Sequence, residues 1–189
     1  MNKLPENFVL DRYGLHVRLV REDDAEFIVQ LRTNPQKARY ISVTSDSLED
    51  QINWIKNYKV REQKGTDYYF VYYFNGVKAG VNRIYEIEGN HFIHGSWIFA
   101  DNVPPYCSLA AGLIAREIAF DTLGLYEEID TAGVHHDNVG VLQYIKLLGV
   151  EFTGIRMHPK GEYLTSKLTK EVFNQNKTKI TRLFPKKIQ

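Results

Sequence analysis

The run Tyr-Tyr-Phe-Val-Tyr-Tyr-Phe at residues 68–74, followed directly by Asn75-Gly76, constrains the fold more than any other part of the chain. Aromatic and β-branched side chains favour strands because they pack well on a pleated surface. Asn-Gly is the preferred pair of a type I′ hairpin turn. The sequence therefore predicts a strand buried on one face, and further strands at 77–85 and 91–100 that complete a meander.

Helical and strand patterns stand on both sides of this meander. The spacing of Ser47 to Asp50 resembles a helix capping box, and Gly65 is placed to end that helix. A nearly all-apolar helix that begins at Ser108 is expected to be buried. The predicted order β-α-α-β-β-β-α-β-α-β-β is a mixed α/β fold, with elements near 15–21, 22–34, 47–65, 68–74, 77–85, 91–100, 108–122, 128–134, 138–148, 150–157 and 162–168.

Composition narrows the class of protein. The 189 residues carry a formal net charge of +1, so no global field attracts nucleic acid or an anionic membrane. No apolar run approaches the ~18 residues of a membrane span, and the first residues lack the apolar segment of a signal peptide. The single cysteine, Cys107, cannot form an intramolecular disulfide. We therefore expect one cytoplasmic domain over 1–189, with a core at about 15–168 and a solvated basic tail at 169–189.

Three motifs resemble one family of enzymes. Gly95-Ser96-Trp97-Ile98-Phe99 is similar to a G-y-W central strand, residues 118–125 to a Y-A-F-e-x-L-G-L helix end, and residues 138–150 to an N-x-x-A/S-i-x-l-Y/L-e-k-l-G-F helix. In this order, over roughly 15–168, they resemble the GNAT acyl-coenzyme A N-acyltransferases, in the branch that contains the ribosomal-protein N-terminal acetyltransferases. The segment 31–35 resembles members that act on nucleotide-linked amino sugars.

The resemblance implies both a fold and an activity. The fold is a twisted, mostly antiparallel sheet with helices on both faces, and the activity is transfer of an acetyl group from acetyl-coenzyme A to a primary amine. The acceptor is expected to be a nucleotide-linked amino sugar or another small amine. A peptide N-terminus is the alternative acceptor, and a domain that binds ligand without turnover is a third reading. No metal, nucleic acid or membrane partner is expected, and a homodimer is left open.

The resemblance also implies where coenzyme A binds. Family members splay the fourth and fifth strands, here near 97–100 and 128–134, and the pantetheine amides pair with the exposed strand groups. The pyrophosphate lies at the N-terminus of the helix that follows the fourth strand. The predicted cofactor-binding residues are Trp97, Ile98, Phe99, Cys107, Ser108, Leu109, Ala110 and Asn138.

Two positions depart from the family pattern. The phosphate loop, Q/R-x-x-G-x-G/A in the family, reads Val103-Pro104-Pro105-Tyr106-Cys107-Ser108 here. Both prolines lack an N–H, and a tyrosine stands where glycine lets the backbone approach the phosphate. The position of the usual catalytic tyrosine is Ile145, with Tyr144 beside it.

The catalytic candidates are His135 as general base and Tyr144 as general acid. Each has a structural alternative. His135 stands in a loop where Asp137 or Asn138 is suited to cap the next helix, and Tyr144 is suited to pack against the sheet. The acceptor side of the site is predicted to contain Arg32, Tyr40, Trp54, Tyr85 and His94.

Overall fold

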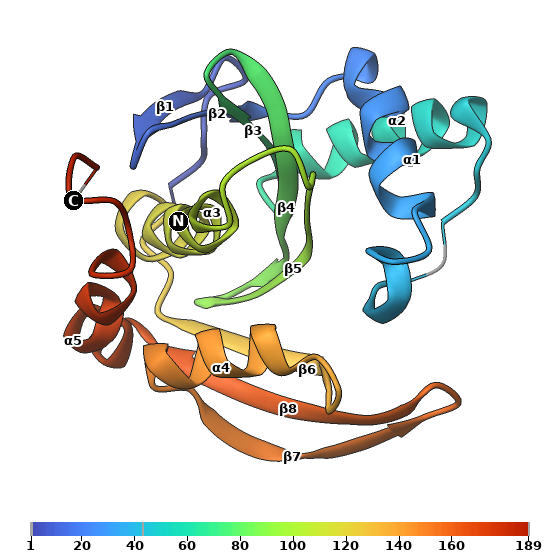
Figure 1. The fold of residues 1–189 in the computed structure, drawn as a ribbon. Helices are drawn as coiled ribbons and strands as arrows, with labels where there is room; N and C mark the ends of the chain where they lie inside the picture. The colour runs from blue at the N-terminus through green and yellow to red at the C-terminus, as the bar shows by residue number, and fades with distance from the viewer. Residues whose placement is uncertain (1, 43, 189) are drawn as a thin grey trace.

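The computed structural model describes residues 2–42 and 44–188, which form an eight-stranded sheet flanked by helices (Figure 1). The strand order is β1-β2-β3-β4-β5-β6-β8-β7, and all neighbours are antiparallel except β5 and β6. The strands are β1 (Val9–Arg12), β2 (Leu15–Leu19), β3 (Tyr68–Phe74), β4 (Val77–Glu88), β5 (His91–Phe99), β6 (Glu127–His135), β7 (Glu151–His158) and β8 (Gly161–Thr169).

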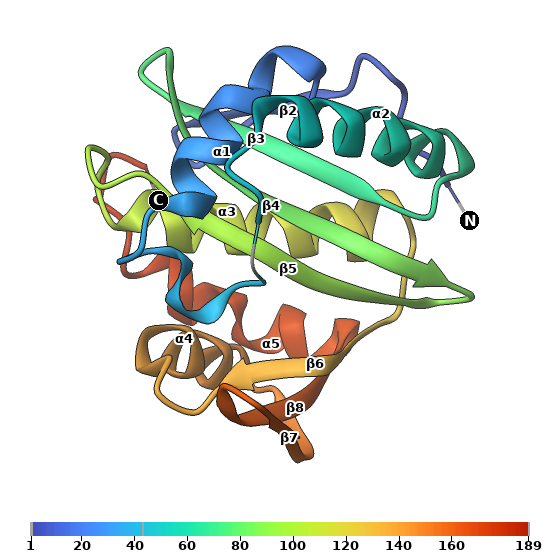
Figure 2. The same ribbon diagram turned by 90° about the vertical axis from the view of Figure 1, so that its right-hand side faces the viewer.

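Helices cover both faces of this sheet, as predicted. The first two helices lie on one face of the sheet and the third and fifth on the other (Figure 2), and their side chains join the cores on those two faces. The helices are α1 (Ala25–Thr33), α2 (Leu48–Lys64), α3 (Tyr106–Glu117), continued by a π-helical turn (Ile118–Thr122), α4 (Val139–Leu148) and α5 (Lys170–Thr181). No helix in the described ranges combines the length and apolar character needed to cross a membrane.

The predicted turn is confirmed, and the predicted capping box is confirmed for the bond to Ser47, whereas the Ser47 N–H donates to the Ser45 hydroxyl and not to Asp50. Asn75 and Gly76 both have positive φ, at 49° and 79°, as a type I′ turn between β3 and β4 requires. The Ser47 hydroxyl accepts a hydrogen bond from the Asp50 N–H at 3.2 Å and so caps α2. Gly65 ends the same helix in the left-handed conformation that only glycine adopts without strain.

Strand β3 is buried on both faces, so the prediction of one buried face is wrong. Tyr68, Phe70 and Tyr72 point into the core under α3, whereas Tyr69 and Val71 point into the core under α1 and α2. A central strand with helices on both sides has no solvent face. The tyrosine hydroxyls are satisfied inside the core; Tyr72, for example, donates to the side chain of Asn82 at 2.8 Å.

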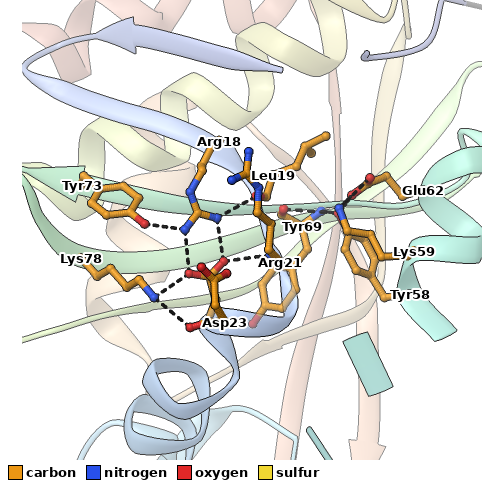
Figure 3. A network of polar contacts seen from close by, with 11 residues as sticks. Arg18, Leu19, Arg21, Asp23, Tyr58, Lys59, Glu62, Tyr69, Tyr73 and Lys78 are labelled. Carbon is orange, nitrogen blue, oxygen red and sulfur yellow. Dashed lines mark hydrogen bonds and ion pairs between the residues drawn. The ribbon is translucent and has the colours of Figure 1, made fainter. Parts of the chain in front are cut away.

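A buried carboxylate ties α1 to the sheet, and Figure 3 labels its partners Arg18 and Lys78. Asp24, fully buried at the start of α1, accepts hydrogen bonds from Arg18 of β2 at 2.7 and 2.9 Å, and Lys78 of β4 lies 2.7 Å away. Burial alone would raise the pKa of Asp24, but the hydrogen bonds from Arg18 and Lys78 hold it below its ordinary value. The helix that carries Arg32 is therefore fixed at its first turn.

The first strand of the sheet and the start of α3 differ from the prediction. A strand that the sequence pattern missed, β1, precedes the expected first strand and pairs with it antiparallel. Helix α3 begins at Tyr106 instead of Ser108, because Pro105, whose φ is −55°, serves as its N-cap. Proline is compatible with the first turn of a helix, where an N–H is not needed.

The predicted solvated tail is instead the helix α5, packed on the core. Thr169 caps it by accepting a hydrogen bond from the Val172 N–H. Phe173 and Ile180, seven residues apart on one face, are both fully buried. Phe173 contacts the ring of Phe120 at a centroid distance of 5.2 Å. Apolar residues at helical spacing outweighed the basic composition of this segment.

Replacing Phe173 with alanine is expected to lower the free energy of unfolding by ~3–5 kcal/mol, because a fully buried ring leaves a cavity beneath α5. Chemical denaturation of the full chain measures this loss. The matched control is Lys179→Ala on the exposed side of the same helix, expected to change stability by less than ~0.5 kcal/mol. Equal effects of the two substitutions would contradict the packed position of α5.

Candidate functional site

A notch opens in the middle of the sheet where β5 and β6 separate. The two strands pair in parallel only through His91 with Glu127 and Phe92 with Glu128. Beyond these pairs they diverge, as Figure 1 shows, so their facing edges lose ladder partners toward the C-terminal end of each strand. The splayed strands expected near 97–100 and 128–134 are these two.

A cavity of about 310 Å³ occupies the notch. Seven of the residues predicted from the sequence line it together, from α1, the following loop, β4, β5, β6 and the start of α4: Arg32, Tyr40, Tyr85, His94, Trp97, His135 and Asn138. Trp54 lies apart, on a second cavity of about 260 Å³ between α1, α2 and the sheet. The two cavities share Arg32, Ser42 and Ser96 in their walls.

The predicted cofactor residues of β5 face different ways. Trp97 lines the notch, whereas Ile98 and Phe99 are buried in the cores on opposite faces of the sheet. The register with β4 shifts here, so that Ser96 and Trp97 oppose Asn82 alone, and Ser96 has a φ of 50°. This bulge releases backbone groups from the ladder at the wall of the notch.

The first turn of α3 offers fewer N–H groups than a glycine-rich loop would. The Cys107 N–H donates to the Pro104 carbonyl at 2.9 Å, and Leu109 and Ala110 lie beyond the residues whose N–H groups a helix leaves free. Tyr106 and Ser108 remain as first-turn N–H donors. The Cys107 side chain is buried, and burial raises the pKa of its thiol.

Asn138 stands at the N-cap of α4 but does not cap it with its side chain. Its backbone N–H donates to the His135 carbonyl at 2.9 Å, and its carbonyl accepts from the Leu142 N–H at 3.0 Å. Asn138 also lines the notch. The alternative that Asn138 caps α4 therefore holds for its backbone alone, and its side chain makes no cap hydrogen bond.

Both ring nitrogens of His135 are engaged with the backbone. Nδ1 accepts a hydrogen bond from the Asp137 N–H at 3.1 Å, and Nε2 lies 2.9 Å from the Lys160 carbonyl, which requires the proton on Nε2. The ligand atoms of His135, His136 and Asp137 lie within 4.8 Å of one another. Because His135 would have to break these bonds first, the geometry favours a loop-bracing role over proton transfer or metal ligation.

Tyr144 is likewise held by the protein. Its hydroxyl donates to the Leu109 carbonyl at 3.2 Å, and its ring meets Trp97 edge to face at 4.9 Å. Burial raises the pKa of Tyr144 well above its ordinary value, although the nearby charge of Arg116 opposes this. A side chain at Gly112 would collide with both rings, so this glycine permits the packing. The geometry supports the packing alternative for Tyr144.

Asp130 of β6 is the notable residue that sequence reasoning missed. It lines the notch, and burial raises its pKa to about 6; its Oδ1 accepts a hydrogen bond from the Gly133 N–H at 2.8 Å. A carboxylate with a raised pKa in a cleft is a frequent mark of a functional site. The sequence contained a pattern that could have identified Asp130, since Glu128 and Asp130 stand two residues apart on a predicted strand and so share one face.

Other buried polar groups surround Asp130. Glu128 forms a two-point ion pair with Arg116, with both N···O distances 2.7 Å. The His94 Nε2 is buried without a hydrogen-bond partner among the described residues, and burial lowers the pKa of His94 well below its ordinary value. Burial and the charge of Asp130 together raise the pKa of Tyr85 to about 12. The notch therefore holds neutral His94 and Tyr85 beside a titrating carboxylate.

The open sheet has a notch between β5 and β6, the N-terminus of α3 follows the fifth strand, and Asn138 at the start of α4 follows the sixth. This is the arrangement that the resemblance to the acyl-coenzyme A N-acyltransferases implies. Solved structures of that class match the chain. FdhC, described as a nucleotide-linked sugar GNAT, is 30% identical over 95% of this chain and 99% of its own, with a TM-score of 0.79.

More distant structures share the fold. RimJ of Mycobacterium smegmatis, in complex with CoA-disulfide, is 15% identical over 92% of this chain and 91% of its own, with a TM-score of 0.75. Spermidine N-acetyltransferase of Vibrio cholerae, in complex with CoA and spermine, is 14% identical over 85% of this chain and 98% of its own, with a TM-score of 0.72. No family model and no curated protein matches the sequence. The chain belongs to the GNAT acetyltransferases.

Proposed function

We propose that this protein transfers an acetyl group from acetyl-coenzyme A to a primary amine on a nucleotide-linked amino sugar. The observation that carries the proposal is Asp130, a carboxylate with a pKa of about 6 in the notch between the splayed strands. It takes the place of His135 as the proposed base, since Asp130 lines the notch with a raised pKa and both ring nitrogens of His135 are held by backbone groups.

The notch suits the pantetheine arm of acetyl-coenzyme A. The diverging edges of β5 and β6 offer backbone N–H and C=O groups to its amides, and the Asn138 side chain stands beside them. The first turn of α3 offers the Tyr106 and Ser108 N–H groups to the pyrophosphate. When bound, the cosubstrate supplies the activated acetyl group as a thioester.

The residues of the notch would act on the amine. At neutral pH Asp130 is charged, so it attracts the ammonium form of the acceptor and takes its proton. The free amine then forms the new N–C bond as the C–S bond breaks, and the second proton that the nitrogen loses goes to the sulfur, so that coenzyme A leaves as its thiol. Backbone groups at the Ser96–Trp97 bulge line the same cavity and are suited to orient the acetyl carbonyl.

The charges of the notch favour an anionic acceptor molecule. Arg32, Arg156 and Lys160 lie on its wall, and the carboxylates there are Glu128, which is paired with Arg116, and Asp130. A nucleotide-linked sugar carries a negative diphosphate, whereas a polyamine is positive along its whole length. The 30% identity to a nucleotide-linked sugar GNAT supports the same acceptor class.

Calorimetric titration with acetyl-coenzyme A, followed by acetylation assays on nucleotide-linked amino sugars, tests the proposal. We expect about one site per chain in the micromolar range, and Asn138→Ala is expected to weaken binding by about tenfold, the equivalent of one hydrogen bond. The matched control is Asn174→Ala, on the exposed surface of α5. No binding at millimolar acetyl-coenzyme A would overturn the acetyltransferase reading and leave a GNAT scaffold with another use.

A further inference from the structure

The second cavity adjoins the notch but has a different character. Its walls are rich in hydroxyl and amide groups from Ser42, Thr44, Gln51, Tyr69 and Ser96, with Arg32 on the side toward the notch. At about 260 Å³ it is smaller than the ~300–1,000 Å³ of pockets that enclose a whole drug-sized ligand. Since three residues line both cavities, one extended molecule could occupy both.

Arg32 is held by neutral groups alone. Its Nε donates to the Thr44 hydroxyl at 2.6 Å, and its Nη2 donates to the Ser42 hydroxyl at 2.8 Å. In the described part of the chain, no carboxylate lies within ion-pair distance of it. Other arginines pair with a buried acid: Arg12, Arg18, Arg61, Arg83 and Arg116. No acid among the described residues therefore neutralises the Arg32 guanidinium, which two hydroxyl groups hold in place.

The rest of the cavity does not cancel this charge. Arg83 on its wall shares Asp67 with Arg61, so two guanidinium groups meet one carboxylate. Asp50, also on the wall, is exposed to solvent and accepts a hydrogen bond from the Ser45 hydroxyl at 2.7 Å. A preorganised guanidinium among hydroxyl donors is the kind of site that binds phosphate.

We propose that Arg32 and the second cavity bind the diphosphate of the acceptor, so that the linked sugar reaches Asp130 in the notch. This inference rests on the proposed function, because it assumes an acceptor that enters the notch amine first. It makes Arg32 a specificity-determining residue that separates nucleotide-linked sugars from free amino sugars and from polyamines. The competing interpretation is that Arg32 only holds Ser42 and Thr44 against α1.

Nucleoside diphosphate binding tests the inference without any need for turnover. The full-length protein, saturated with coenzyme A to block the cosubstrate site, is titrated with UDP and with dTDP. Arg32→Gln is expected to weaken binding by about 10–100-fold, the equivalent of a charge-assisted hydrogen bond. Arg32→Lys, which keeps the charge without the two-point fork, is expected to lose less. The control Arg39→Gln alters an exposed guanidinium nearby and is expected to change binding by less than about twofold.

The outcomes separate this inference from the proposed function. Wild-type protein that binds neither nucleotide, or Arg32→Gln that binds as wild type does, would overturn the inference. If Arg32→Gln loses thermal stability together with binding, Arg32→Lys is compared with Ser42→Ala, which removes one hydroxyl that holds the guanidinium. An Arg32→Lys protein that binds the nucleotides as tightly as Ser42→Ala would also overturn the inference. Arg32-dependent binding without acetylation of any nucleotide-linked amino sugar would leave the diphosphate site standing and refute the transfer activity.

Discussion

Asp130→Asn is expected to lower kcat for acetyl transfer by about 10²–10³-fold while acetyl-coenzyme A binding stays within about twofold. Asparagine keeps the shape of the side chain and its hydrogen bond from the Gly133 N–H, but it cannot take a proton from the amine. Steady-state kinetics with a nucleotide-linked amino sugar measure the change. The control is Asp46→Asn, an exposed acid outside both cavities, for which no change in kcat is expected.

The pH dependence of the same variant gives an independent readout. The pKa of Asp130 is raised to about 6, so wild-type activity is expected to fall as the pH drops through 6 and the carboxylate gains a proton. Asp130→Asn should lack this limb of the profile. A low-pH limb near 6 that persists in the variant would assign the base to another group.

The raised pKa also affects stability. Because the folded chain holds the Asp130 proton more tightly than the unfolded chain, the stabilisation from this group is full below about pH 4 and is lost as the pH rises through about 6. Asp130→Asn is therefore expected to be more stable than wild type at pH 7–8, by about 1–2 kcal/mol after allowing for its contact with water in the notch. Thermal melts of both proteins at pH 4 and pH 8 measure this difference, and a variant less stable than wild type at pH 8 would contradict it.

Glu128→Leu is expected to lower the free energy of unfolding by ~3–5 kcal/mol, because it leaves the charge of Arg116 buried without a partner. Arg116 is only 2% exposed, and its Nε and Nη2 both donate hydrogen bonds to the Glu128 carboxylate. For a chain of this size the loss corresponds to a fall in Tm of roughly 6–20 °C, which differential scanning calorimetry measures.

Two further variants separate charge burial from packing in this pair. Arg116→Met with Glu128→Leu removes both charges and is expected to recover most of the lost stability. Glu151→Gln breaks the exposed pair with Lys167 and should cost less than ~1 kcal/mol. A double variant as unstable as Glu128→Leu would mean that the shape of the ion pair matters more than its charge.

Local chemistry explains where the sequence predicted the fold well. The hairpin at Asn75-Gly76, the cap at Ser47 and the stop at Gly65 depend on residues within a few positions of one another, so they can be read from the chain. The same holds for the order of strands and helices between 15 and 168. The helix α5 was predictable in principle from the spacing of Phe173 and Ile180, but the basic residues around them indicated a solvated tail.

For the candidate site, the sequence predicted which residues take part but not their chemical states. The sequence alone brought Arg32, Tyr40, Tyr85, His94, Trp97 and Asn138 into consideration, and all of them line one cavity. It could not rank them, because the state of each group depends on partners distant in the chain. Lys160 occupies one nitrogen of His135, Leu109 accepts from Tyr144, and burial between diverging strands raises the pKa of Asp130.

Residue types and local periodicity thus determined the secondary structure and the family resemblance of this protein, since these depend on short-range steric and hydrogen-bonding preferences. Only the tertiary structure decided which polar groups stay available for chemistry. Asp130 and Arg32 are set apart by desolvation and by the charge of their neighbours, and both quantities arise when β5, β6 and α1 come together in space.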